Sequence, residues 1–157
     1  MSRRPVALAA AFAVLGTLTA CAPDPVDPAQ IAQWRSDRQA EIDADGPFLA
    51  VLSSDASIGR ESDRMESKFD QQQLPTAVTF DCFGDGDLEL ALDSASTTGT
   101  ATTTETTIRT ITCGDGTHEI DSASLGTDPI NLVGVTISDA DRDTAWFLTV
   151  RGVQSAP

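Results

Sequence analysis

Alternation between apolar and polar residues most constrains the fold of this 157-residue chain, because it sets a period of two from Leu74 onward. The apolar members of the first two runs are Val78, Phe80 and Cys82, and then Leu88, Leu90 and Leu92. Later runs cover 108–113, 117–121, 130–138 and 144–153, separated by Gly, Asp, Ser or Pro. Such runs are typical of antiparallel strands. We therefore predict a mainly β domain over residues 74–157, an antiparallel β-sandwich or sheet of five to six strands, with an α+β fold as the alternative.

An N-terminal helical segment is expected before these strands. Asp27 and Pro28 suit the N-cap and first helical positions. Apolar residues at spacings of three and four follow, and Gly46 with Pro47 ends the pattern. The apolar stripe is thin, which predicts a helix lying against the domain. We assign residues 28–73 to this segment; periodicity does not assign 48–52, and the charged stretch 57–73 fits either a second surface helix or a flexible excursion.

The first twenty residues have the pattern of a secretory signal peptide. Arg3 and Arg4 precede an uncharged apolar run from Val6 to Ala20, as the n-region and h-region of such peptides require. This run is shorter than the roughly 20 residues that a spanning helix needs. We therefore exclude residues 1–20 from the folded domain.

The four residues 18–21, Leu-Thr-Ala-Cys, resemble the lipobox of bacterial lipoprotein precursors. The resemblance implies that the thiol of Cys21 carries a diacylglycerol and that cleavage leaves Cys21 as the N-terminus. The alternative is a plain secreted protein with an unmodified cysteine. Two acyl chains hold a protein stably on a bilayer, whereas one does so only marginally. Residues 22–28 contain three prolines, so residues 21–27 are expected to form a semi-rigid tether, and we predict an anchor on the extracytoplasmic face of the cell membrane.

Charge and length exclude several classes of function. Removing residues 1–20 leaves 8 basic against 24 acidic side chains, a net charge of −16. That charge argues against nucleic acid as a partner and against basic-patch binding to anionic lipid. The remaining 137 residues suffice for one ordinary domain, but not for a two-lobed solute-binding protein.

Cys82 and Cys113 remain once Cys21 is assigned to lipid. An even pair outside the cytoplasm predicts a disulfide, with two free buried thiols as the alternative. Their spacing is too wide for a redox Cys-x-x-Cys site. The loops 82–86 and 113–116 are similar in sequence, which we interpret as two hairpin turns beside one bridge in preference to a duplicated module. This half of the chain resembles the small β domains of uncharacterised actinobacterial lipoproteins, which imply no activity.

Asp139, Asp141 and Asp143 stand at alternate positions, as at the start of an EF-hand loop. The sixth position is Thr144 where glycine belongs, and the twelfth is Val150 where glutamate belongs, so the loop is not an EF-hand. An acidic turn is the favoured interpretation. A weak calcium site using Asp141 with Asp85 or Asp87 is the alternative.

Catalytic residues are not indicated by any motif. His118 is the single histidine, and no Gly-x-Ser-x-Gly elbow accompanies it to suggest a triad. With 24 acidic residues, paired carboxylates arise by chance. We predict no catalytic residue, no metal and no cofactor.

Two further stretches bear on binding. Thr102, Thr104 and Thr106 would share one strand face, either in a solvated hairpin arm turning at Gly99 or as a patch that contacts or carries glycan. Apolar bulk on both faces of the last run predicts packing on both sides. Exposure of Phe83 or Phe147 would instead indicate a protein partner.

These observations predict a lipid-anchored, non-enzymatic binding or accessory module at the cell envelope, contacting a protein or an envelope glycan. The alternative is a small hydrolase using acidic residues and His118. A deep pocket converging on His118 would favour the hydrolase.

Overall fold

The computed structural model describes residues 26–114 and 116–154; the predicted signal peptide, Cys21 and most of the tether lie outside the described residues. The elements are α1 (Pro28–Asp45), β1 (Ala50–Ala56), β2 (Met65–Cys82), β3 (Asp87–Thr98), β4 (Ala101–Thr112), β5 (His118–Ile120), the short 3-10 helix η1 (Ser122–Leu125), β6 (Ile130–Ser138) and β7 (Thr144–Gln154). The prediction of a mainly β fold is confirmed, although the described part of the chain has seven strands where five to six were expected.

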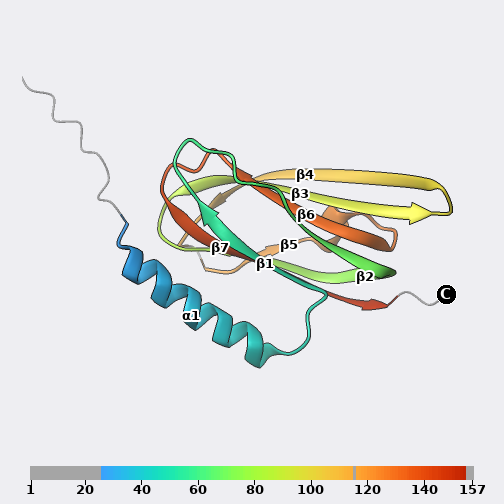
Figure 1. Ribbon diagram of the computed structural model, residues 1–157, viewed down its shortest axis with the longest axis horizontal. Helices are drawn as coiled ribbons and strands as arrows, with labels where there is room; N and C mark the ends of the chain where they lie inside the picture. The colour runs from blue at the N-terminus through green and yellow to red at the C-terminus, as the bar shows by residue number, and fades with distance from the viewer. Residues whose placement is uncertain (1–25, 115, 155–157) are drawn as a thin grey trace, which may run out of the picture.

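The strands form one antiparallel sheet in the order β1-β7-β2-β6-β3-β4, with β5 paired to β2. The 18-residue strand β2 joins the two parts of this sheet. Its first part pairs with β6 and its second part with β7 and β5, with a register shift between Lys68 and Gln73. We call β4, β3, β6 and the start of β2 the first layer, and β5, the end of β2, β7 and β1 the second layer. Helix α1 runs along the outside of the second layer (Figure 1).

The core lies between the two layers. Alternate residues of each strand point into it, among them Phe80 and Trp146, whose rings stack with centroids 6.0 Å apart. Leu90, Leu92, Val135 and Ile137 contribute from the first layer, and Leu52, Val78, Leu148 and Val150 from the second. Each of these large side chains gains about 1.5–3 kcal/mol on burial. The period of two thus determines which residues form the core.

The predicted disulfide is confirmed: Cys82 and Cys113 are bonded, with Cα atoms 5.2 Å apart. Cys82 ends β2, and Cys113 follows β4, so the bond joins the two layers at one end of the sandwich. Closing the 31-residue separation stabilises the fold by roughly 3–4 kcal/mol in the chain-entropy model.

The expectation of a helical segment over 28–73 is correct only as far as Asp45. The N-cap Asp27 accepts a hydrogen bond from the Ala29 N–H at 2.9 Å, with Pro28 in the first turn, and the helix ends at Gly46. Residues 50–56 are β1, and 65–73 are the first part of β2. Met65 and Phe69 pack against the core, while Glu66 and Lys68 are exposed. This charged stretch therefore alternates as a strand does, but only two large apolar residues mark the alternation.

The two glycine-containing loops beside the disulfide are not hairpin turns. Strands β2 and β3, joined by Phe83–Gly86, are not neighbours in the sheet, and β5, which follows the second loop, pairs with β2. Both loops cross from one layer to the other. They meet closely: a Cβ added at Gly114 would lie 2.6 Å from the Gly84 carbonyl oxygen. Glycine is therefore required there by contact between two backbones.

The hairpin arm predicted at Gly99 is confirmed. Strands β3 and β4 pair along their whole length, from Asp87 with Thr112 to Thr98 with Ala101. Gly99 begins the two-residue turn with φ +62°, as a tight hairpin turn of this kind needs.

Within residues 26–114 and 116–154, no helix combines the length and apolar character needed to cross a bilayer.

Candidate functional site

A cavity lies between α1 and the outer face of the second layer. It has a volume of about 510 Å³. We call it the helix–sheet groove. Its lining residues are Arg38, Glu41, Ile42, Ala44, Asp45, Phe48, Thr79, Thr117, Thr149 and Arg151. Two walls of the groove therefore come from different parts of the chain, the helix with its following loop and the strands β2 and β7.

An aromatic contact holds α1 over the sheet. The ring of Trp34 lies between those of Phe83 and Phe147, with centroid distances of 5.9 and 5.7 Å. Phe147 is only 3 % exposed and Phe83 is half-buried. The prediction that β7 packs on both faces is thus confirmed. The exposed aromatic side chain that would have indicated a protein partner is not present at either position.

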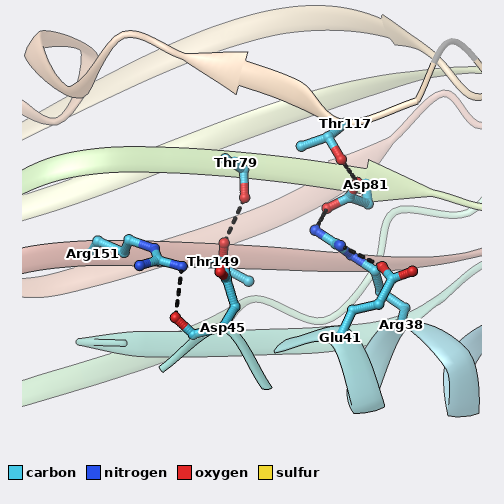
Figure 2. A network of polar contacts seen from close by, with 8 residues as sticks. All are labelled: Arg38, Glu41, Asp45, Thr79, Asp81, Thr117, Thr149 and Arg151. Carbon is cyan, nitrogen blue, oxygen red and sulfur yellow. Dashed lines mark hydrogen bonds and ion pairs between the residues drawn. The ribbon is translucent and has the colours of Figure 1, made fainter. Parts of the chain in front are cut away.

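One end of the groove is built on Asp81, a carboxylate that is only 6 % exposed. Its Oδ2 accepts a hydrogen bond from Arg38 Nη2 at 2.6 Å, and its Oδ1 accepts one from Thr117 Oγ1, also at 2.6 Å (Figure 2). Arg38 Nη1 lies 2.8 Å from Glu41 Oε2. Burial acts to lower the pKa of Arg38, but the carboxylates of Glu41 and Asp81 outweigh it and raise that pKa. The guanidinium therefore stays charged.

The floor and the other end of the groove are also polar. Thr79 and Thr149 share a hydrogen bond between their hydroxyl oxygens, 2.5 Å apart, and Thr149 is 3 % exposed. Arg151 pairs with Asp45, and its guanidinium lies 4.5 Å from the centroid of the Phe48 ring. Arg151 thus has a salt bridge on one side and an aromatic surface on the other.

This arrangement suits recognition of a polar ligand by hydrogen bonds. The guanidinium groups donate, the carboxylates of Glu41 and Asp45 accept, and the threonine hydroxyls do both. The two arginines stand at opposite ends of the floor, each held by a carboxylate. A hydroxyl-rich ligand could exchange hydrogen bonds with both ends without neutralising any buried charge.

His118 lies outside this groove. It begins β5, is partly exposed, and its Nε2 lies 3.0 Å from the Thr112 carbonyl oxygen. Its neighbour Thr117 lines the groove, but His118 does not. The structure therefore does not bring His118 into the helix–sheet groove.

The acidic turn 139–143 holds the ends of strands together. Asp141 Oδ1 accepts a hydrogen bond from the Asp87 N–H at 2.8 Å, and Asp143 Oδ1 accepts one from the Ile58 N–H at 3.1 Å. Asp85 pairs with Arg142, and Asp139 adopts φ +50°. In the described ranges no three acidic, His or Cys side chains are grouped as metal ligands. Asp141 and Asp143 of this turn therefore accept from backbone N–H groups, and Arg142 of the turn pairs with a carboxylate of the β2–β3 loop.

The threonine row, Thr102, Thr104 and Thr106, lies exposed on the outer face of β4. Thr106 Oγ1 donates to Asp93 Oδ1 at 2.7 Å, and Thr102 lies 3.2 Å from Thr97 between hydroxyl oxygens. The row is therefore part of the exposed β3–β4 hairpin arm.

Sequence reasoning missed the groove. Arg38 and Asp81 are 43 residues apart, and neither belongs to a recognised motif. A usable signal was present in β2, where Asp81 stands among apolar neighbours on the face away from the core. A carboxylate in that setting requires a covering donor.

Comparisons with protein-family models, with curated proteins and with solved structures find no match to this chain.

Proposed function

We propose that this protein is a lipid-anchored, extracytoplasmic, non-enzymatic binding module, and that it holds an envelope glycan in the helix–sheet groove. The observation that carries the proposal is the groove itself, a cavity of about 510 Å³ lined by guanidinium, carboxylate and hydroxyl groups. Sites for small ligands are typically cavities of this size with a few fixed polar groups.

The N-terminal sequence supports the proposed location. The residues resembling a lipobox end at Cys21, and α1 begins at Pro28. The helical wall of the groove therefore begins seven residues after the proposed anchor. A ligand of the groove would lie close to the membrane surface, within reach of envelope polymers.

A neutral glycan fits the groove better than an anionic ligand does. Both arginines are already paired with carboxylates, and the chain has a net charge of −14. An anion would have to displace Asp45 or Asp81 and approach against this field. Hydroxyl groups exchange hydrogen bonds with the same side chains at no such cost, and the Phe48 ring offers an apolar surface beside them.

Intact mass of the protein purified from its own membranes tests the anchor. We expect a chain beginning at Cys21 with a diacylglycerol added, and two hydrogens gained on reduction of the Cys82–Cys113 bond. An unlipidated chain beginning elsewhere would contradict the proposed anchor and location.

Binding of polysaccharide prepared from the envelope of the same cells tests the groove. The variants Arg151→Gln and Thr149→Val should each weaken binding by about tenfold, the effect of losing roughly 1.4 kcal/mol. Thr104→Val, in the threonine row, is the matched control and should bind normally. Binding lost with Thr104→Val alone would place the glycan on β4 and contradict the groove; no binding by the unaltered protein would contradict the glycan.

A further inference from the structure

Strand β4 is a long sheet edge. It is the last strand in the order β1-β7-β2-β6-β3-β4, has 12 residues, and is exposed from Ala101 to Thr106 and again at 108–110. The opposite edge, β1, has 7 residues and is joined to α1 by the Arg35–Asp55 salt bridge. Natural sheets protect long edges with charge, proline, bulges or cover, because free N–H and C=O groups template pairing with another strand.

The backbone groups of β4 that point away from β3 can be identified. The Cys113 N–H donates to the Gly86 carbonyl at 2.7 Å, so Cys113 directs its groups toward β3. Since antiparallel partners alternate between hydrogen-bonded and non-hydrogen-bonded pairs, odd-numbered residues of β4 bond to β3 and even-numbered residues face the edge. The contact from His118 Nε2 to the Thr112 carbonyl agrees with this and ends the free edge at Thr110.

The side chains of β4 are unusually neutral for this chain. The protein has a net charge of −14, yet β4 contains one acid, Glu105, and one base, Arg109, on either side of Thr107. Arg109 donates to the hydroxyl of Ser124 at 3.0 Å. Within the described residues neither Glu105 nor Arg109 takes part in a salt bridge, whereas Arg35, Arg38, Arg64, Arg142 and Arg151 all do.

We propose that the edge of β4 pairs with the same edge of a second copy of this chain, antiparallel and with the two-fold axis at Thr107. In this register Glu105 of each copy faces Arg109 of the other, and Thr106 faces Ile108. The even-numbered residues, whose backbone groups are free, form the hydrogen-bonded pairs. Glu105 and Arg109 then occupy non-hydrogen-bonded pairs, where side chains lie closest.

With the axis at Thr106 or Ile108 the backbone groups still match, but Glu105 and Arg109 then face uncharged residues and their charge pairs are lost. The other neighbouring registers are excluded outright. A shift of one residue pairs even-numbered residues of one copy with odd-numbered residues of the other. The backbone groups of those odd-numbered residues are already bonded to β3, so the hydrogen bonds between the copies cannot form. A shift of the two-fold axis to Glu105 or to Arg109 sets like charges face to face, and like charges directly opposite are destabilising. The register centred on Thr107 satisfies both the backbone and the charges. This inference does not depend on the glycan or on the anchor.

Sedimentation of the full chain in detergent, over a range of concentrations up to millimolar, tests the pairing. We expect a monomer–dimer equilibrium in the unaltered protein. The variants Glu105→Arg and Arg109→Glu should each weaken the dimer at least tenfold, because each sets two pairs of like charges opposite one another. Mixed in equal amounts, the two variants should form a dimer as tight as that of the unaltered protein, since every pair is then of opposite charge.

Matched controls make the same charge changes elsewhere. Glu61→Arg and Arg60→Glu alter exposed residues in the β1–β2 loop and should leave the dimer unchanged. A chain that stays monomeric at the highest concentration would overturn the proposal. If Arg109→Glu left the dimer affinity unchanged, the edge of β4 would not be the dimer interface. If a mixture of the two variants stayed monomeric, the proposed register would be wrong. Independently, Thr107→Cys should yield a 107–107 cross-link by mass spectrometry, and its absence from a dimer would also overturn the register.

Discussion

The outer faces of the two layers are built from the same alternating pattern but experience different surroundings. On the second layer, α1 covers the sheet, and the salt bridge of Arg38 with Asp81 has side chains 20 % and 9 % exposed. On the first layer no helix of the described residues covers the salt bridge of Arg64 with Asp93, whose side chains are 45 % and 23 % exposed. By covering the second layer, α1 removes the polar side chains there from solvent. A polar group left without a partner under the helix therefore lowers the stability of the fold more than one on the first layer does.

Removal of Trp34 should have the largest effect, because its large ring contacts both Phe83 and Phe147 of the sheet side. Trp34→Ala is expected to lower the free energy of unfolding by about 3 kcal/mol, the low end of the range for aromatic truncation, since the ring is half-buried. Ile108→Ala, at a residue 59 % exposed on the bare face, should cost less than about 0.5 kcal/mol. Urea unfolding measures both. If both substitutions lowered the free energy of unfolding equally, the Trp34 contact would contribute no more to stability than an exposed side chain does.

Loss of a carboxylate should distinguish the two faces next. Asp81→Ala leaves Thr117 without its acceptor in a covered site and leaves Arg38 with the more exposed Glu41. We expect a cost of about 2 kcal/mol. Asp93→Ala removes the corresponding carboxylate on the bare face, where solvent replaces it, and should cost about 0.5 kcal/mol. Thermal unfolding of the two variants provides the comparison. A larger loss for Asp93→Ala would show that cover by α1 does not set the energy of these pairs.

A smaller difference is expected for hydroxyl groups. Thr149→Val removes the hydrogen bond of the part-buried Thr79–Thr149 pair and should destabilise the protein by about 1 kcal/mol. Thr104→Val, at an exposed position, should change stability by less than about 0.5 kcal/mol. Chemical denaturation resolves a difference of this size. If Thr149→Val were neutral, the shared hydrogen bond would be no better than one to water.

The smallest effect concerns Glu66, on the bare face. A hydrogen bond from Lys68, with the charges of Lys68 and Arg64, lowers the pKa of Glu66. A carboxyl whose pKa is lowered on folding adds stability above its ordinary pKa and loses it as the pH falls through the folded value. Lys68→Met should raise the pKa of Glu66 toward its ordinary value in an NMR titration, whereas Arg60→Met should leave it unchanged. Screening by solvent should keep any change in stability below detection.

Much of the fold could be predicted because burial follows the strand period. The runs containing Phe80, Leu90 and Trp146 each place alternate residues in the core, as expected. The first part of β2 was missed because only Met65 and Phe69 carry its period, while its remaining residues favour helix or loop by composition. Local pattern therefore predicts strands where apolar residues are dense, and fails where they are sparse.

The candidate site could not be predicted from local pattern. Arg38 contacts Asp81 only because α1 folds back across β2, and Arg151 reaches Asp45 from the far end of the chain. Pairings at such separations depend on the path of the helix over the sheet, which no spacing in the sequence encodes. Cys82 and Cys113 are an exception, because chemistry allows a cysteine pair few alternatives.

The way α1 is attached determines how the molecule would respond to a pulling force. A load applied through the residues before Val26 enters α1 first. Helix α1 is held by the Trp34 ring contacts, by the buried side chain of Ile42 and by salt bridges from Arg35, Arg38 and Arg151. The sheet beyond it is held by continuous strand pairing and by the Cys82–Cys113 bond. Tension would therefore peel the helix away and open the groove while the sandwich stays folded, which makes the groove sensitive to mechanical strain.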